Sequence, residues 1–192
     1  MGTIITKPAS ASGGGGGGAH AFVVPTSVNF PNGFVTSSIY TLGAINVVET
    51  ANRLSAYPFI SFQTITSTAL VIRCAAGVAS ALGRIAIYSN VNGEPITRLY
   101  ESADIDLSTS GDKTVLTAFT FTAGTVYWLA FHSSSTPTMG GIQSAAMIPV
   151  FANSSQFYNH YYQGIAYGTS SPTTFSATTY NIGNVTNINI KL

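Results

Sequence analysis

Three carboxylates that lie close together in the sequence are the residues best spaced to do chemistry. They are Glu101, Asp104 and Asp106. Glycoside hydrolysis uses two carboxyl groups about 5 to 10 Å apart, one as an acid and the other as a base or nucleophile. Asp104 and Asp106 also suit a shared calcium ion, but the chain has no Asp/Asn/Gly loop of EF-hand spacing. The alternative is that all three are solvated surface acids with no role in a reaction.

A second stretch carries the kinds of groups that recognise sugars. Aromatic rings pack against the C–H faces of a sugar, and amide groups bond to its hydroxyl groups. Residues 157–167 supply both kinds, and the predicted glycan contacts are Tyr158, Asn159, His160, Tyr161, Tyr162 and Gln163. The alternative is that these side chains pack inside the fold or against another subunit.

The charge content restricts the partners of this chain. Only 7% of its residues are charged, against about 25% in an ordinary soluble domain, and the net charge is +1. Every charged residue except Lys7 and Lys191 lies between Glu49 and Lys113. Because nucleic-acid binding needs clustered Lys and Arg, we predict no nucleic-acid partner. A neutral surface suits contact with identical subunits, contact with neutral sugars, or plain exposure to water.

Single residues argue against several other kinds of site. The one cysteine, Cys74, has no partner for a disulfide within the chain, and its apolar neighbours predict a buried, inert thiol. Trp128 lies in the most apolar segment and is predicted to be a core residue rather than a sugar platform. Residues 69–88 are apolar, but Arg73 and Arg84 leave a run far shorter than the roughly 20 residues of a membrane helix. We predict no cofactor, no metal site and no membrane insertion.

The elements that hold these residues are predicted to be β-strands. Val, Ile, Thr, Tyr and Phe are abundant, and Gly and Ser interrupt the chain every several residues. The predicted strands are residues 44–49, 60–65, 69–75, 84–88, 113–121, 125–132 and 187–192, with Leu192 facing inward in the last. Turns are predicted at residues 90–95, where Gly93 is free to adopt positive φ, and at residues 108–112. The pattern predicts an all-β fold, an antiparallel β-sandwich that is jelly-roll-like.

A run of consecutive glycines, Gly13 to Gly18, divides the sequence. Glycine has no side chain to pack, so such a run favours a linker. We predict an N-terminal anchoring arm at residues 1–12, a Gly-rich linker at 13–20 and a β-sandwich at 21–192, in which residues 21–43 form docking or edge strands. An arm this short cannot bury a core of its own, so we expect it to lie against another protein. Its predicted contact residues are Thr3, Ile4, Ile5, Lys7 and Pro8.

One part of the chain resembles a known family. Residues 83–95 (GRIAIYSNVNGEP) are similar to a pattern in bacteriophage tail-fibre and other virion appendage proteins, where an Arg-Leu-Gly-Ile-Tyr-like strand runs into an Asn-Gly-x-Pro turn. The resemblance extends through residues 104–113 and 123–130, and covers about residues 51 to 133 in all. It implies a β-sandwich exposed on a virion, often a trimer, with no catalytic residues. It also implies a surface position for the three carboxylates, so we expect them to be solvated.

These observations together predict a non-enzymatic structural protein of a phage virion. Its N-terminal arm, which together with the linker spans residues 1–20, would bind a neighbouring virion protein. Its sandwich would be displayed outward as a homotrimer and would attach to a host-surface glycan. The arm is not followed by an extended shaft, so a capsid decoration protein that stabilises the virion without binding a receptor is an alternative. A second alternative is an appendage that cleaves polysaccharide with the three carboxylates.

Overall fold

Strands are the only regular elements in the part of the chain that the computed structural model describes. These residues are 28–29, 34–36, 45–61, 63–143, 151–152, 157–158, 160–176, 179–181 and 183–192. Among them there is no helix, in line with the abundance of β-branched and aromatic residues. The all-β prediction is therefore confirmed.

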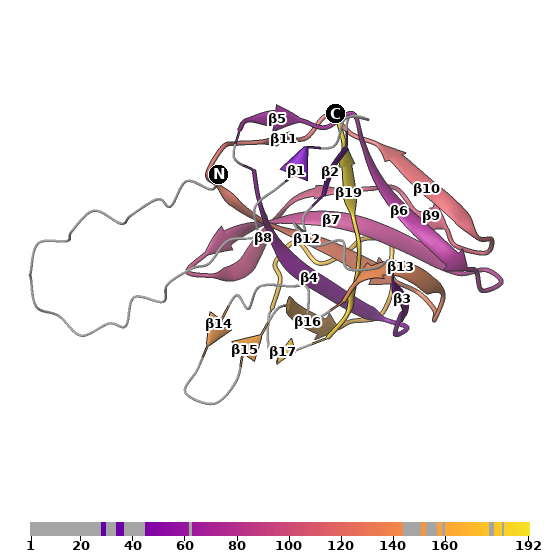
Figure 1. Cartoon of the computed structure of the whole chain (residues 1–192). Coiled ribbons are helices and arrows are strands. Elements are labelled where there is room, and N and C mark those ends of the chain that lie inside the picture. Colours follow the sequence, from indigo (N-terminus) through magenta and orange to yellow (C-terminus); the bar gives the residue numbers. More distant parts are fainter. Residues whose placement is uncertain are drawn as a thin grey trace, which may run out of the picture.

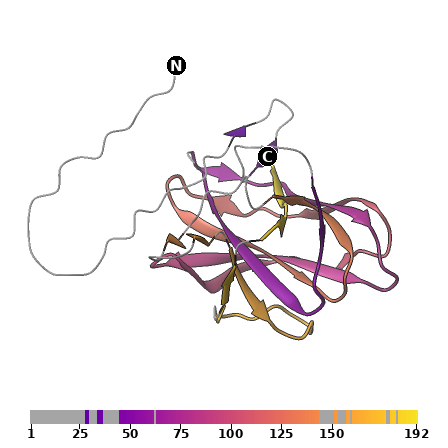
Figure 2. The same cartoon turned by 60° about the horizontal axis from the view of Figure 1, so that its bottom comes forward.

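Two antiparallel sheets pack against each other as a β-sandwich, which confirms the predicted sandwich (Figure 1, Figure 2). Sheet A contains β1 (Val28–Asn29), β2 (Phe34–Thr36), β3 (Ile45–Val48), β6 (Ala69–Ala76), β10 (Gly111–Leu116), β13 (Thr138–Ile142), β18 (Val185–Thr186) and β19 (Asn189–Lys191). Sheet B contains β4 (Arg53–Ile60), β7 (Leu82–Val91), β8 (Glu94–Glu101), β9 (Ile105–Asp106), β12 (Val126–Ser133), β16 (His160–Gly164) and β17 (Thr179–Asn181). Two short pairs join β5 (Ile65–Thr66) to β11 (Thr120–Phe121) and β14 (Phe151–Ala152) to β15 (Phe157–Tyr158).

Sheet B runs in the order β17-β16-β4-β12-β7-β8, and β12 lies near its centre. The register places Leu129 of β12 opposite Ile87 of β7, and Trp128 opposite Tyr88. Because successive side chains of a strand point to opposite faces, Leu129 and Ile87 enter the core between the sheets while Trp128 and Tyr88 face away from it. Both faces of β12 are thus buried, as its continuous apolar sequence predicts.

The core between the two sheets, which we call the inner core, is built from aromatic and aliphatic side chains of both layers. Phe59 and Phe121 meet edge to face with ring centroids 5.1 Å apart, and Tyr127 packs on Phe121 at 5.3 Å. Such aromatic pairs add stability beyond the apolar area that they bury. Cys74 lies in this core with none of its surface exposed, which confirms the prediction of a buried thiol.

Strand β4 contains a proline, Pro58, although proline cannot donate to a ladder. Its neighbour β12 pairs with β4 along the whole strand, whereas β16 pairs with it only from Arg53 to Ala56. Pro58 therefore lies beyond the paired length on the β16 side. A missing N–H is tolerated at such a position.

The turn between β7 and β8 matches its prediction. Asn92 and Gly93 have φ angles of 52° and 87°, and Val91 pairs with Glu94 across the turn. Two residues with positive φ form the hairpin turn whose twist fits antiparallel strands, and the Asn-Gly sequence favours it. The prediction of positive φ at Gly93 is confirmed.

Three predicted strand details are wrong. Residues 60–65 do not form one strand, because β4 ends where this range begins and β5 starts where it ends. Residues 113–121 belong to two strands, β10 of sheet A and β11 beside β5, and between them Thr117 N donates to Thr68 O. Leu192 is 40% exposed instead of facing inward.

Candidate functional site

Sheet B carries a second hydrophobic cluster on its outer face, the face turned away from sheet A. We call it the outer cluster, and its buried members are Leu54, Ala56, Ala86, Tyr88, Trp128, Ala130, Tyr161 and Phe175. Three central strands contribute a row of alanines, since Ala130 lies opposite both Ala56 and Ala86. These small side chains leave room above the sheet for larger groups, which come from β16 and from the segment after it.

Residues 165–176, which we call the covering loop, lie over this outer face. The loop follows β16 and reaches β8, the strand at the far end of the sheet order. At its start Ile165 N donates to Asn52 O over 2.9 Å, and near its end Thr174 lies opposite Thr97 of β8. The loop is therefore bonded to the residue before β4 at its start and to β8 near its end.

The far part of the covering loop pairs with β8 like a short extra strand. Arg98 N donates to Thr173 O over 2.9 Å, and Phe175 N donates to Ile96 O over 2.7 Å. The Phe175 ring packs edge to face on Tyr88, with centroids 5.3 Å apart. Backbone pairing and one aromatic anchor thus hold this end of the loop on the sheet.

A buried arginine holds the middle of the covering loop. The side chain of Arg84 is 5% exposed, and its guanidinium lies 2.6 Å from Asp104 Oδ1. The same guanidinium donates to Gly168 O over 2.7 Å and lies 4.4 Å from the centroid of the Tyr167 ring. Tyr167 Oη also donates to Asp104 Oδ1, over 2.7 Å. Burial, followed by this hydrogen bond to a carboxylate, raises the pKa of Tyr167.

A second ion pair binds the loop nearer to β8. Arg98 and Glu101 lie 2.8 Å apart, with side chains 19% and 15% exposed. Both bind the backbone of Ser171, since Arg98 donates to its carbonyl and Glu101 accepts from its N–H. Next to it, Tyr88 Oη donates to Pro172 O over 2.8 Å. Charge-assisted bonds of this kind are stronger than bonds between neutral groups.

Beneath the loop lies a histidine with no exposed surface, His132. Its Nε2 is 3.1 Å from Ile165 O, and because a carbonyl only accepts, Nε2 carries the hydrogen. The ring packs on Tyr167 with centroids 4.9 Å apart, and Nδ1 is buried without a hydrogen-bond partner. Burial lowers the pKa of His132, and the nearby Arg84 acts in the same direction. These surroundings favour the neutral form of the imidazole.

The three carboxylates of the sequence-based hypothesis have different surroundings. Glu101 is not a solvated acid, and Asp104 is only partly solvated, because Arg98 and Arg84 hold them in ion pairs against the covering loop. Asp106 is exposed and accepts from Ser108 N over 2.8 Å, and hydrogen bonds to Ser108 lower its pKa. The prediction of a surface position was wrong for Glu101 because the covering loop crosses it. That none of the three is catalytic stays a prediction.

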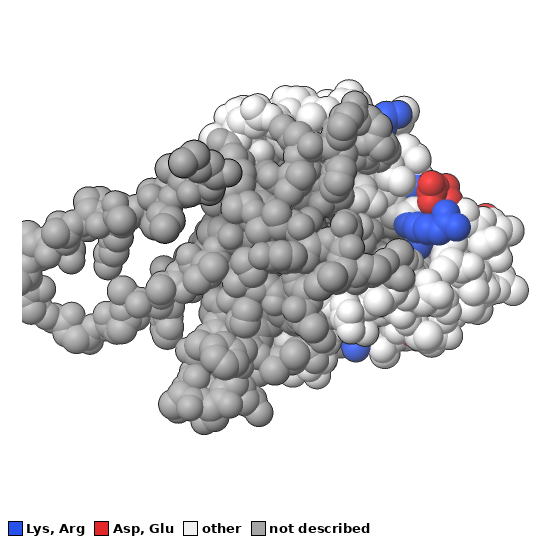
Figure 3. Space-filling view, in the orientation of Figure 1, with Lys and Arg blue, Asp and Glu red and all other residues white. Residues whose placement is uncertain are grey.

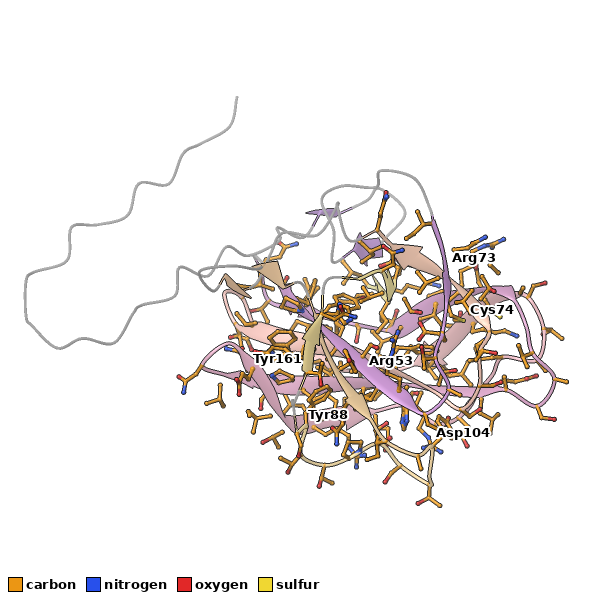
Figure 4. The ribbon with its side chains drawn as sticks, turned by 90° about the horizontal axis from the view of Figure 1, so that it is seen from below. Arg53, Arg73, Cys74, Tyr88, Asp104 and Tyr161 are labelled. Atoms are coloured by element: carbon orange, nitrogen blue, oxygen red, sulfur yellow. The ribbon has the colours of Figure 1, made fainter. Side chains whose placement is uncertain are left out.

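The predicted glycan residues fall into three groups. Tyr161 and His160 are each 2% exposed, and Tyr161 packs edge to face on Trp128 at 5.3 Å, so these rings are not available to a sugar. Tyr162 is half-buried with Arg53 5.6 Å from its ring centroid, and Gln163 is half-buried with its Oε1 accepting from Ser176 N over 3.3 Å. Figure 4 shows Tyr161 and Tyr88 toward the middle of the molecule.

The other predicted site residues lie where the structure gives no side-chain contacts. The backbone of Tyr158 is in β15, and Asn159 lies outside the described residues. The anchoring residues Thr3, Ile4, Ile5, Lys7 and Pro8 also lie outside them. The glycan site stays a prediction for Tyr162 and Gln163, and equally for Tyr158 and Asn159.

Sequence reasoning missed the residues that hold the covering loop. Arg84, His132 and Arg98 were not predicted to share a site, because their partners are up to 84 positions away. One signal was available, since Arg84 and His132 each stand in a strand of mostly apolar residues. A charged or titratable side chain in such a strand must find a partner when it is buried.

A separate buried acid, Glu49, lies just after β3. It is 4% exposed, Thr186 Oγ1 donates to its Oε1, and its Oε2 is buried without a hydrogen-bond partner. Burial raises the pKa of Glu49, although Thr186 and the positive charge of Arg53 oppose the shift. His160 is also buried, and burial lowers its pKa to about 4.

Replacing this acid by its neutral isostere is expected to stabilise the protein. A pKa raised in the folded state means that Glu49 favours folding below its ordinary pKa and opposes it as the pH rises through the folded value. Glu49→Gln keeps the acceptor for Thr186 and removes the proton dependence. We expect its Tm at pH 8 to be higher by about 2–4 °C, as for about 1 kcal/mol in a domain of this size. The gain in Tm should shrink toward pH 4. An equal gain in Tm at pH 8 and pH 4 would contradict a raised pKa of Glu49.

Among the described residues, no three His, Cys, Asp or Glu side chains gather closely enough to hold a metal ion. The same residues include no helix with the length and apolar character needed to cross a membrane. In comparisons with known proteins, no family model and no curated protein matches this chain.

Proposed function

We propose that this chain is a non-enzymatic structural protein of a bacteriophage virion, with its β-sandwich displayed outward to contact the host surface. The observation that carries the proposal concerns the charged residues in the stretch that resembles phage appendage proteins. In that stretch Arg84 with Asp104, and Arg98 with Glu101, bind the covering loop. These charges bind the covering loop to sheet B instead of serving proton transfer. Such a structural use of charge suits a display domain.

The sequence supports a division of labour along the chain. Residues 1–12 bind a neighbouring virion protein, residues 13–20 separate assembly from display, and the sandwich is the displayed part. The edge of sheet A carries β1 and β2, with β2 paired to β19, so these two strands belong to the sandwich side of this division.

A capsid decoration protein is the second candidate, and the surface favours it. Figure 3 shows one face on which the described atoms are mostly uncharged, with the charged side chains in a few small groups. A neutral face loses little solvation when it is buried against neighbouring subunits. In this role the sandwich stabilises the particle and binds no receptor.

Incorporation into particles tests the virion role. Replacing Ile4 and Ile5 by Asp in the phage that encodes the chain should lower its amount in purified particles about tenfold, equivalent to about 1.4 kcal/mol of lost contact. Burying a charge in an apolar contact costs at least this much. Quantitative mass spectrometry of the particles measures the effect, and Thr3→Ser is the matched control. Absence of the native chain from particles would refute the virion role, and equal amounts of variant and native chain would refute the anchor.

Adsorption to host cells separates the two candidates. Particles that carry Tyr162→Ala with Gln163→Ala should assemble normally and adsorb more slowly, if the sandwich contacts a glycan. Thr114→Ala, an exposed change on β10, is the control. Unchanged adsorption, together with particles that lose heat stability when the chain is deleted, would favour the decoration protein.

A further inference from the structure

We propose that the covering loop is a lid that opens in acid. Residues 165–176 then lift together off the outer face of sheet B, while the rest of the sandwich stays folded. Opening removes Phe175 from the outer cluster, where it packs on Tyr88 and which also contains Trp128. The lid follows from the contacts of residues 165–176 and does not depend on the proposed virion function.

The covering loop is separable from the inner core. The inner-core residues that the structure describes include none from residues 160–176. The two ends of the loop lie together, since Ser176 N donates to Gln163 Oε1 over 3.3 Å. Within the loop, Phe175 is the large apolar side chain that is fully buried. A surface loop with adjacent ends is an Ω-loop, and segments with few buried apolar contacts open before the rest of a fold.

A buried cation holds the middle of the lid. The side chain of Arg84 is 5% exposed and forms an ion pair with Asp104. Its guanidinium donates to Gly168 O and lies against the Tyr167 ring. A second cation next to Arg84 would be an uncompensated buried charge, which is strongly destabilising. Lifting residues 165–176 relieves this cost, because it returns the site to water.

A proton on His132 supplies such a second cation. Arg84 from β7, Glu101 from β8 and Tyr167 from the lid are the titratable groups around this ring, and β4 places the apolar Leu54 opposite it. A protonated ring would put a second cation beside Arg84 in a buried place. Since burial lowers the pKa of His132 in the closed state, the open state binds the proton more tightly. The closed state is therefore favoured above about pH 6.5 and loses stability as the pH falls below it.

The only tryptophan of the chain reports on the lid. Trp128 has no exposed surface, and its Nε1 donates to Asn90 Oδ1 over 3.0 Å. Its fluorescence and its quenching by acrylamide are measured from pH 7.5 to pH 4.5, with far-UV circular dichroism on the same samples. We expect a red shift and a several-fold rise in quenching at pH values where the β-sheet signal is unchanged.

A reversible lock makes the test specific to the lid. Thr97 and Thr174 lie opposite each other, and the flanking hydrogen bonds make them a non-hydrogen-bonded pair, whose Cα atoms are about 4.5 Å apart. This spacing suits a disulfide, and both residues are exposed while Cys74 is buried. In Thr97→Cys/Thr174→Cys the oxidised form should show no acid-dependent rise in quenching, and the reduced form should behave like the native protein.

A second variant tests the role of the imidazole. His132→Gln retains a donor for Ile165 O but does not titrate, so opening should shift to lower pH. Three results would overturn the lid: quenching that stays low until the sheet signal is lost, equal quenching in the oxidised and reduced lock, or an unchanged opening pH in His132→Gln.

Discussion

Truncation of Trp128 to Ala is expected to lower the free energy of unfolding by about 3–5 kcal/mol, the range for removing a large buried aromatic side chain. Trp128 has no exposed surface and packs against Tyr161 with ring centroids 5.3 Å apart. The truncation leaves a cavity between β12 and the residues that cover it, and it leaves Asn90 Oδ1 without the indole donor. Urea unfolding followed by far-UV circular dichroism measures the loss.

The matched control for this prediction is an exposed apolar residue. Leu116 is 84% exposed at the end of β10, so Leu116→Ala should change the free energy of unfolding by less than about 0.5 kcal/mol. Trp128→Phe should fall between the two. If Trp128→Ala costs no more than Leu116→Ala, the outer cluster does not act as a second core, and the covering loop has little to protect.

Trp128 also shows which part of the fold could be predicted from the sequence. The segment 125–132 is apolar on both faces, and this pattern predicted a central strand with a buried tryptophan, as the structure confirms. The pattern does not say what covers each face. That depends on sheet order, because Tyr161 reaches Trp128 only when β16 lies beside β4.

Alternation predicted strands better than it predicted where they end. Residues 84–88 were predicted from their period of two, and they lie in β7. The same alternation continues through residues 113–121, but the chain leaves sheet A after Leu116 and pairs with β5 from Thr120. Local periodicity is preserved when a strand changes partner, so it does not signal the change.

The candidate site shows the same limit more strongly. The aromatic residues 157–163 suggested a sugar surface, yet Tyr161 is buried, because it packs on Trp128 in the outer cluster, which also contains Phe175 of the covering loop. The pairs that hold the loop join residues far apart in the sequence, such as Arg84 with Gly168 and Tyr88 with Pro172. Pairs of this kind follow from the packing of the loop on the sheet, which composition and spacing do not encode.

A single methyl group at Gly77 is expected to destabilise the protein by about 3 kcal/mol, the upper part of the usual range for overpacking. A Cβ built at Gly77 would lie 2.4 Å from both C and O of Ser108 and 2.6 Å from Thr109 N. All three are backbone atoms, so no side-chain rotation relieves the clash. Gly77→Ala must therefore move one of two backbone segments, and urea unfolding measures the cost.

The expected place of the damage follows from the hydrogen bonds around Gly77. Val78 N donates to Leu107 O over 3.1 Å, and Leu107 N donates to Ala81 O over 2.9 Å, so this close approach ties the β6–β7 connection to the segment before β10. Hydrogen exchange in Gly77→Ala should accelerate at these amides first. Gly168→Ala is the control, because a Cβ there meets no atom within 4 Å and should cost little or nothing. Equal stability of the two variants would mean that the approach of Gly77 to Ser108 is not tight in solution.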